Sequence, residues 1–222
     1  MPVSNGVKIN FRTEWFSIFC LISVGLIAWW AYPHLSAMVP SHWNIQGEID
    51  GYMSRLGHTI GIPSMILGLY VLFLVIPVLE PRRKNFFRSI GFYQMIRNFM
   101  MGFMLFLYVV TTWVGVTGQL LAIDKIVPLA VGILFIFIGN YMNQIKSNFF
   151  MGIRTPWTLS SDTVWQKTHR LGGYTFVVGG VLFMIAIFFK DPWNFYLPMV
   201  GILLAALVPV VYSYILFRQE KK

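Results

Sequence analysis

The sequence contains little charge. Asp, Glu, Lys and Arg make up 11% of its 222 residues, against about 25% in an average soluble domain. Hydrophobic residues make up 57%, so the chain is expected to be a membrane protein and not a soluble globular domain. A single cysteine, Cys20, excludes an intramolecular disulfide and any metal site built from several thiolates.

The hydrophobic residues are concentrated in long runs. Each run approaches the roughly 20 residues that a helix needs to cross about 30 Å of hydrocarbon. We therefore predict an all-α fold, a polytopic integral membrane bundle of about six transmembrane helices. The first run is too long for the core of a signal peptide and lacks a cleavage site, so we expect it to remain as an anchor. The predicted spans cover about 15–37, 59–79, 92–115, 126–145, 171–189 and 196–217.

The lysines and arginines indicate an orientation, because such residues accumulate on the cytoplasmic side of a membrane. With the N-terminus inside, three of the 17 fall outside, namely Arg55, Lys125 and Lys190. We therefore predict that both termini are cytoplasmic. The basic residues are spread over several loops, so direct binding of nucleic acid is not expected. The fourteen predicted to be cytoplasmic are Lys8, Arg12, Arg82, Arg83, Lys84, Arg88, Arg97, Lys146, Arg154, Lys167, Arg170, Arg218, Lys221 and Lys222.

Two connections between the spans are long enough to carry function. They are an outer loop at about 38–58 and an inner loop at about 146–170. We treat 1–222 as a single membrane domain, with an N-terminal two-span unit at about 10–80 and a C-terminal four-span unit at about 90–217.

The inner loop is expected to be folded. Pro156 restricts Thr155 to extended or turn geometry, and a Ser or Asp at 160–162 can cap a following helix. On that helix Trp165 and His169 share one face, and Lys167 and Arg170 share another. One interpretation is a juxtamembrane helix with tryptophans and bases at the lipid headgroups; the other is a functional cap.

Polar side chains near two predicted span ends favour the functional interpretation. Such groups are costly at membrane depth unless they face a partner or water. We predict that they line a cytoplasm-facing cavity beneath the inner loop, with Glu80 as the nearest carboxylate for Arg97. Ordinary interhelical hydrogen bonds are the simpler alternative. Gln94, Arg97 and Asn98 also allow a surface helix in place of the third span. The candidates are Gln94, Arg97, Asn98, Asn140, Asn143 and Gln144, with Ser147 at the next helical position.

Paired glycines in the fifth span indicate close helix packing. Gly172 and Gly179 share one helix face, and Gly173 and Gly180 share another. Small residues at this spacing allow two helix backbones to approach each other.

The outer loop is rich in turn formers and histidines. Asn, Gly and Asp residues favour turns, whereas the histidine spacings of eight and sixteen match no helical or finger-type metal site. Hydrogen bonds that stabilise the loop are therefore favoured over a metal, and no metal or cofactor is predicted. The loop candidates are His42, Asn44, Gly47, Asp50 and Gly51, and the weak metal candidates are His34, His42, His58, Glu48 and Asp50.

Two motifs resemble known families. The stretch NFFMGIRTPWTL at 148–159, followed by Trp165, Lys167, Thr168, His169, Arg170, Leu171 and Gly172, resembles the signature of the SdpI family of bacterial membrane immunity proteins. The pattern P-x-H-W-N-x-x-G-x-x-D-G at 40–51 is similar to that of an uncharacterised domain often found N-terminal to it.

The resemblance implies a multi-pass protein of the bacterial plasma membrane that protects the producing cell from a secreted peptide toxin. It also implies signalling by capture of a cytoplasmic transcriptional repressor. The alternatives are a membrane enzyme using His169 as acid or base beside Arg154 and Arg170, or a lipid-binding, peptide-binding or transport protein that uses the cavity. The inner residues to which the resemblance assigns function are Asn148, Gly152, Arg154, Thr155, Pro156, Trp157, Trp165, Thr168, His169 and Arg170.

Overall fold

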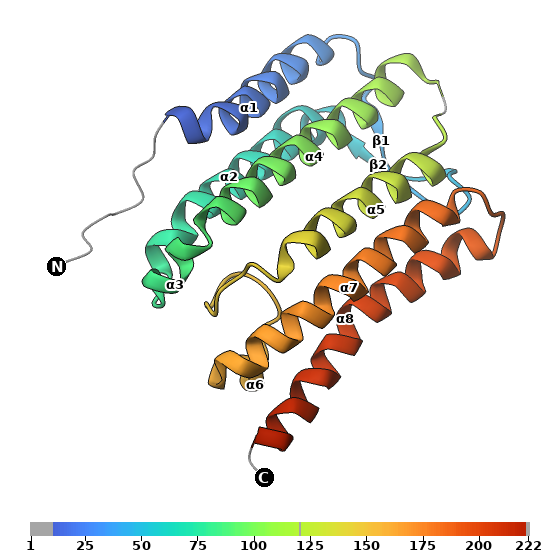
Figure 1. Ribbon diagram of the computed structural model, residues 1–222. Coiled ribbons are helices and arrows are strands. Elements are labelled where there is room, and N and C mark those ends of the chain that lie inside the picture. Colours follow the sequence, from blue (N-terminus) through green and yellow to red (C-terminus); the bar gives the residue numbers. More distant parts are fainter. Residues whose placement is uncertain (1–10, 120, 221–222) are drawn as a thin grey trace. The chain divides into compact units, whose positions relative to one another are not determined.

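The computed structural model describes residues 11–119 and 121–220 (Figure 1). Within these ranges six helices are long and apolar enough to cross a membrane, which confirms the polytopic helical prediction. Lys8, Lys221 and Lys222 lie outside the described residues. The long helices are α1 (Phe11–Ala31), α2 (Ile62–Leu79), α4 (Ile90–Thr117), α5 (Ile123–Met142), α7 (Asp162–Ala186) and α8 (Trp193–Glu220); the shorter elements are β1 (Met38–Trp43), β2 (Ile49–Ser54), η1 (Gly57–Gly61), α3 (Arg83–Arg88) and α6 (Pro156–Ser160).

Two helix boundaries differ most from the prediction. The first span ends at Ala31, not near residue 37, because Pro33 lacks the N–H that the next helical turn needs. The helix of the fifth span begins at Asp162, nine residues before the predicted start of that span and at the position predicted for a separate capped helix. Its polar first turns and its transmembrane part form one continuous helix, since Ser161 caps its beginning and the glycines at 172–173 do not break it.

The chain folds into two compact units. The first contains the chain up to Leu79 together with Gln94–Ile123, and the second contains Glu80–Tyr93 and the chain from Asp124 onward. Most of α4 therefore groups with α1 and α2, whereas α5, α7 and α8 belong to the second unit.

The first unit has a buried apolar core and a buried ion pair. Cys20, Ile66 and Tyr108 belong to the core. An Arg97 Nη lies 2.8 Å from a carboxylate oxygen of Glu14, and both side chains are at most 4% exposed. The expectation that Arg97 pairs with Glu80 is therefore wrong, because its helix turns that position toward α1.

Other polar groups of α4 also bond within the first unit. The Arg97 guanidinium donates to the Thr13 carbonyl, and Ser17 Oγ donates to Asn98 Oδ1 at 3.1 Å. Tyr70 OH on α2 donates to the second oxygen of Glu14. Interhelical hydrogen bonds thus use Arg97 and Asn98, and α4 is a continuous helix from Ile90 to Thr117, not a surface helix.

His58 lies in the short π-helical segment η1 at the start of the second span. Its side chain is fully buried; Nε2 lies 2.9 Å from Thr112 Oγ1 and the ring stacks on Tyr108. Its expected place in the outer loop beside Glu48 and Asp50 is wrong, because the helix of the second span begins before this residue.

In the second unit α7 and α8 lie side by side (Figure 1). A Cβ on Gly179 would lie 2.8 Å from the Gly201 carbonyl of α8, so the two backbones are in contact. On the other face, a Cβ on Gly173 would lie 2.8 Å from the Gly139 carbonyl of α5. The predicted packing role of the glycines is confirmed: one face meets α8 and the other meets α5.

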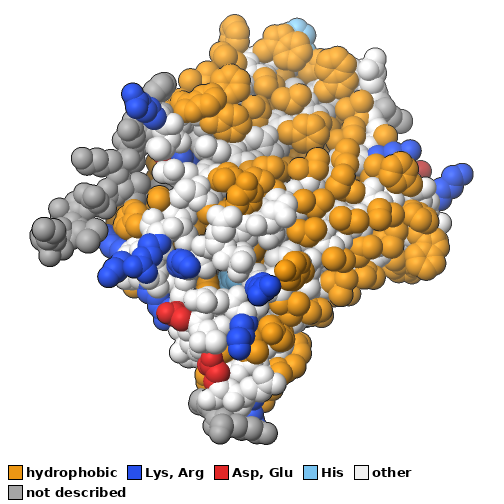
Figure 2. Space-filling view, viewed as in Figure 1, with side chains coloured by type: hydrophobic (Ala, Val, Ile, Leu, Met, Phe, Trp, Pro, Cys, Tyr) orange, Lys and Arg blue, Asp and Glu red, His pale blue; other side chains and the backbone are white. Residues whose placement is uncertain are grey.

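Hydrophobic side chains cover much of the face drawn in Figure 2, whereas lysines and arginines occupy separate patches on it. Large apolar side chains are exposed on several of the helices, including Trp29 at 78% and Phe188 at 82%. Exposed apolar surface on long apolar helices is suited to contact with lipid.

Candidate functional site

The inner loop begins with a turn built around Asn148. This side chain is fully buried. Its Oδ1 accepts hydrogen bonds from the backbone N–H groups of Phe150 and Met151, at 2.8 and 2.6 Å, and its Nδ2 donates to the Lys146 carbonyl. One side chain therefore satisfies three backbone groups and defines the turn.

Gly152 and His169 hold the next part of the loop. Gly152 has φ +92°, and a Cβ there would collide with His169 Nε2. The Ile153 N–H donates to Nε2 at 3.0 Å, and Nδ1 lies 2.8 Å from the Trp165 carbonyl. A backbone N–H can only donate and a carbonyl can only accept, so the ring is a neutral imidazole with its proton on Nδ1.

Trp165, on α7, joins this helix to the segment that follows α5. Its ring stacks on His169 at a centroid distance of 4.1 Å, which confirms that the two share a helix face. Its Nε1–H donates to the Ile145 carbonyl at 2.8 Å. Both side chains are 1% exposed, so this pair is the core of the inner loop.

The short helix α6 is capped and anchored by threonines. Thr155 Oγ1 accepts from the Thr158 N–H, and Thr158 Oγ1 accepts from the Thr155 N–H, which is a capping box. Pro156 occupies the first turn, where its missing N–H costs nothing. The Thr155 hydroxyl also shares a hydrogen bond with Ser213 on α8, at 3.1 Å, and Trp157 packs on Tyr214 of the same helix.

Glu80 and Arg82 brace the loop, a role that the sequence patterns did not indicate. Glu80 is 1% exposed, and its two oxygens accept from the N–H groups of Arg82 and Phe149. Arg82 donates to Ser147 Oγ and to the Leu159 carbonyl. The available signal was a carboxylate directly after a long apolar run, since a buried charge needs partners.

The predicted inner residues divide into buried and exposed sets. Thr168 is fully buried, and Arg154 is exposed and donates to the Phe149 carbonyl at 2.8 Å. The buried set therefore maintains the fold, and the exposed set is the part that can meet a ligand. The buried set is Asn148, Thr155, Trp165, Thr168 and His169, and the exposed or partly exposed set is Gly152, Arg154, Pro156, Trp157 and Arg170.

Two of the predicted cavity residues line a groove in the second unit. Asn140 and Asn143, at the end of α5, face Lys167 and Arg170 of α7 across a hollow of about 510 Å³. Lys167 and Arg170 therefore share a face, as predicted. Gln144 is exposed and its carbonyl lies near Ser89. Gln94 belongs to the first unit.

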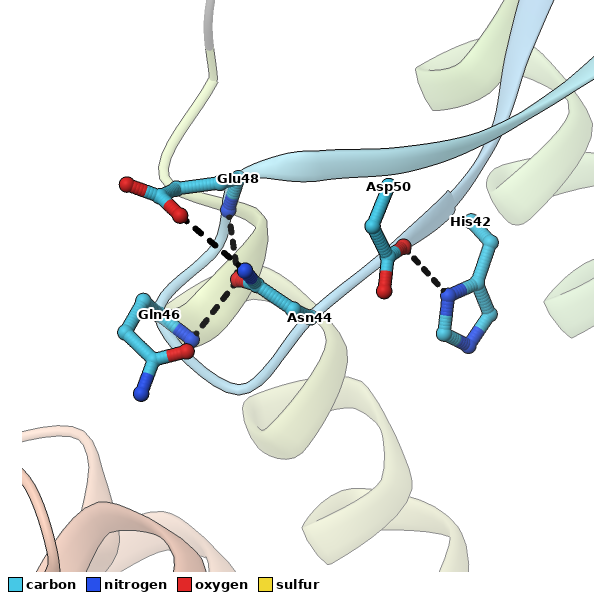
Figure 3. Close-up of polar contacts among 5 residues, drawn as sticks. All are labelled: His42, Asn44, Gln46, Glu48 and Asp50. Atoms are coloured by element: carbon cyan, nitrogen blue, oxygen red, sulfur yellow. Dashed lines mark hydrogen bonds and ion pairs between the residues drawn. The ribbon is translucent and has the colours of Figure 1, made fainter.

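The outer loop forms an antiparallel hairpin of β1 and β2, which the all-α prediction did not include. At its tip Asn44 Oδ1 accepts from the N–H groups of Gln46 and Glu48, and Asn44 Nδ2 donates to the Glu48 carboxylate (Figure 3). Gly47 has φ +80°, a conformation that favours glycine. These contacts explain why Asn44 and Gly47 are needed in the turn.

His42 and Asp50 join the two strands. His42 Nδ1 lies 2.6 Å from Asp50 Oδ1, and both side chains are exposed (Figure 3). A Cβ on Gly51 would lie 2.8 Å from the Cβ of His42, its partner across the hairpin. The motif residues of the outer loop therefore interact with one another.

The candidate metal ligands are dispersed. His34 lies against the Trp30 carbonyl, whereas His58 is buried beside Thr112 and His42 contacts Asp50. Among residues 11–119 and 121–220 no three His, Cys, Asp or Glu side chains are arranged to hold a metal ion.

Comparison with known proteins points to one family. Residues 144–213 match the model of the SdpI/YfhL protein family, and residues 18–67 match a domain of unknown function, DUF1648. Over 188 residues the chain is 28% identical to the immunity protein SdpI of Bacillus subtilis (strain 168), covering 85% of this chain and 87% of that protein. No solved structure matches.

These matches support the assignment of the chain to the SdpI family and a membrane immunity role. The family match contains the whole inner loop from Gln144 onward, and the second match contains the hairpin. Since six helices in the described part of the chain are long and apolar enough to cross a membrane, the chain is a multi-pass bacterial membrane protein.

Proposed function

We propose that this chain protects the bacterium that produces it from a secreted peptide toxin, and that it signals by capturing a cytoplasmic transcriptional repressor. The observation that carries the proposal is the inner loop. Its buried groups fix one conformation while its charged groups remain exposed, and it lies within the region similar to the SdpI family. A loop built in this way suits recognition better than it suits a simple connection between spans.

The proposal places the inner loop in the cytoplasm and the hairpin outside. Positive residues on the inner side support this orientation. A toxin would then be met from outside or within the bilayer, and the repressor from inside. Arg154 and Lys146 are exposed on the inner loop and supply the positive surface for the repressor.

Catalysis by His169 is the less favoured alternative. A general acid or base must reach the proton that it transfers. Both ring nitrogens of His169 already bond to backbone groups, at 3.0 and 2.8 Å, and the side chain is 1% exposed. These contacts argue for a structural role.

Protection can be tested by complementation. The full chain is expressed in a Bacillus subtilis strain 168 derivative that lacks its own SdpI, and the cells are challenged with the toxin that SdpI opposes. Survival should rise toward that of cells with SdpI. A chain that reaches the membrane in normal amounts without raising survival, against this toxin and against the secreted peptides of its own host, would refute the immunity role.

Arg154→Gln separates protection from capture. This change removes an exposed charge and one hydrogen bond, so the variant should fold and still protect. Membrane recruitment of a fluorescent repressor encoded beside this chain's gene should fall. Lys190→Gln, on the predicted outer side, is the matched control and should recruit normally. Equal recruitment by both variants would contradict the proposed capture surface.

A further inference from the structure

The groove between α5 and α7, which we call the amide groove, is not used by the buried core of the inner loop. It encloses about 510 Å³. Asn140 and Asn143 supply amides from the α5 side, and Gln166 supplies another from α7. Lys167 and Arg170 supply the charge, and Tyr174 lies farther along α7.

Helix packing forms the floor of the amide groove. A Cβ on Gly139 would lie 2.7 Å from the Gly173 carbonyl, so α5 and α7 touch through their backbones at this point. Both glycines line the groove. Neither glycine has a side chain that could extend into the groove at this point.

The charge on the described residues that line the amide groove is positive, and the nearest acidic residue that shares a hollow with Lys167, Glu220, lines a separate one. Lys167 and Arg170 are exposed, and neither forms an ion pair with another described residue. None of the described residues that line the groove is acidic. Two cations with neighbouring amide donors are suited to a phosphate group, which accepts several charge-assisted hydrogen bonds.

The length of the groove indicates that the ligand is amphipathic. From Lys167 it continues along α7 to Val177, ten residues or about 15 Å farther along the helix. Tyr174 and Val177 offer apolar surface at that end, and Tyr174 is 62% exposed. A soluble anion would use the cationic end alone, whereas a phospholipid would place its headgroup there and an acyl chain beside the apolar end.

We propose that the amide groove binds an anionic phospholipid of the leaflet on the side of the inner loop, with its phosphate between Lys167 and Arg170. This site is independent of the immunity role, so failure of the protection assay would leave it standing. The bound lipid would lie directly beside the part of α7 that carries Trp165 and His169.

The test compares two lipids with identical acyl chains, phosphatidylglycerol and phosphatidylcholine, bound to the full chain in detergent and measured by native mass spectrometry. The wild type should prefer phosphatidylglycerol. K167Q/R170Q should bind it about 30-fold more weakly, since each basic residue near an anionic lipid contributes a factor of about five. Its melting temperature should stay close to that of the wild type, because both side chains are exposed.

The control K146Q/R218Q removes the same charge from exposed positions outside the groove. It should retain the affinity of the wild type within about twofold. Equal losses in the two double variants, or no preference between the lipids, would overturn the proposal. Glycerol phosphate, the soluble headgroup, should compete poorly; if it displaced phosphatidylglycerol fully at matched concentration, the site would belong to a soluble anion instead.

Discussion

Gly152 combines two constraints at the scale of a single residue. Its φ of +92° lies in the left-handed region, and the space where a Cβ would stand is occupied by His169. The same ring nitrogen that would be struck accepts the Ile153 N–H. Any side chain at this position would therefore disrupt the hydrogen bond that joins the inner loop to α7.

Gly152→Ala should destabilise the protein by about 2 kcal/mol, because a non-glycine residue at positive φ costs about 1–3 kcal/mol before the contact with His169 is included. Thermal unfolding of the detergent-purified protein, followed by tryptophan fluorescence, measures the effect. Gly91→Ala is the matched control, because its Cβ would meet nothing within 4 Å; it should leave the melting temperature unchanged or raise it. Equal melting of the two variants would show that the strain is absent.

Glu14 and Arg97 allow a second test at this scale. Glu14→Gln or Arg97→Met alone leaves one buried charge without its partner and should cost about 3–5 kcal/mol. The double variant carries neither charge, so its loss should be smaller than the sum of the two single losses. Unfolding measured for all four proteins gives the coupling energy. Additive losses would mean that the 2.8 Å contact does not hold the charges together.

The hairpin shows, at the scale of an element, how a short motif builds a turn. Asn44 alone accepts two backbone N–H groups and donates to Glu48. His42 and Asp50 then tie the strands together behind the tip. The contacts at the tip therefore lie within the hairpin, whereas Val39 on β1 is buried against Ala31 of α1 and Val116 of α4.

Asn44→Ala should loosen the tip without unfolding the helices. The two N–H groups lose their acceptor, at a cost of about 1 kcal/mol each for ordinary hydrogen bonds. Hydrogen exchange of residues 43–50 should rise, while exchange in α4 and α7 stays unchanged. Ser41→Ala, on β1 away from the tip, is the control and should exchange as the wild type does. Unchanged exchange at the tip of the Asn44 variant would refute this account.

The elements differ in how far they could be predicted. The spans could be predicted from the length of the apolar runs, and the shared face of Trp165 and His169 from helical spacing. Both depend only on residues that are close together in the sequence. A helix capped at 160–162 was predicted, but its continuity with the fifth span in α7 was missed, since its polar first turns are not expected in a transmembrane helix. The strands were missed because both contain residues that favour turns, Pro40 in β1 and Asp50 and Gly51 in β2.

The contacts of Glu80 could not be predicted for a different reason. Its partner Phe149 is 69 positions away in the chain, and no spacing rule connects the two. The sequence offered Arg97 as a partner because its charge is opposite, whereas the fold brings that arginine to Glu14. Pairings at long sequence distance depend on helix packing, which local patterns do not contain.

The orientation of the whole molecule can be tested by labelling introduced cysteines, because the chain has a single cysteine of its own. Cys20 is fully buried, so a membrane-impermeant thiol reagent should label it weakly. Gln46→Cys in the hairpin should react in intact cells. Thr163→Cys, exposed near the start of α7, should react only after the membrane is opened. The reverse pattern would invert the predicted topology.

The continuity of α7 has a mechanical consequence. Twenty-five residues make a rod of about 37 Å with no break between the capping Ser161 and Ala186. Glycine contacts on two sides leave this rod little room to rotate about its own axis. A force on the far end of α7 would therefore tilt the entire helix, and Trp165, His169 and the inner loop would move with it.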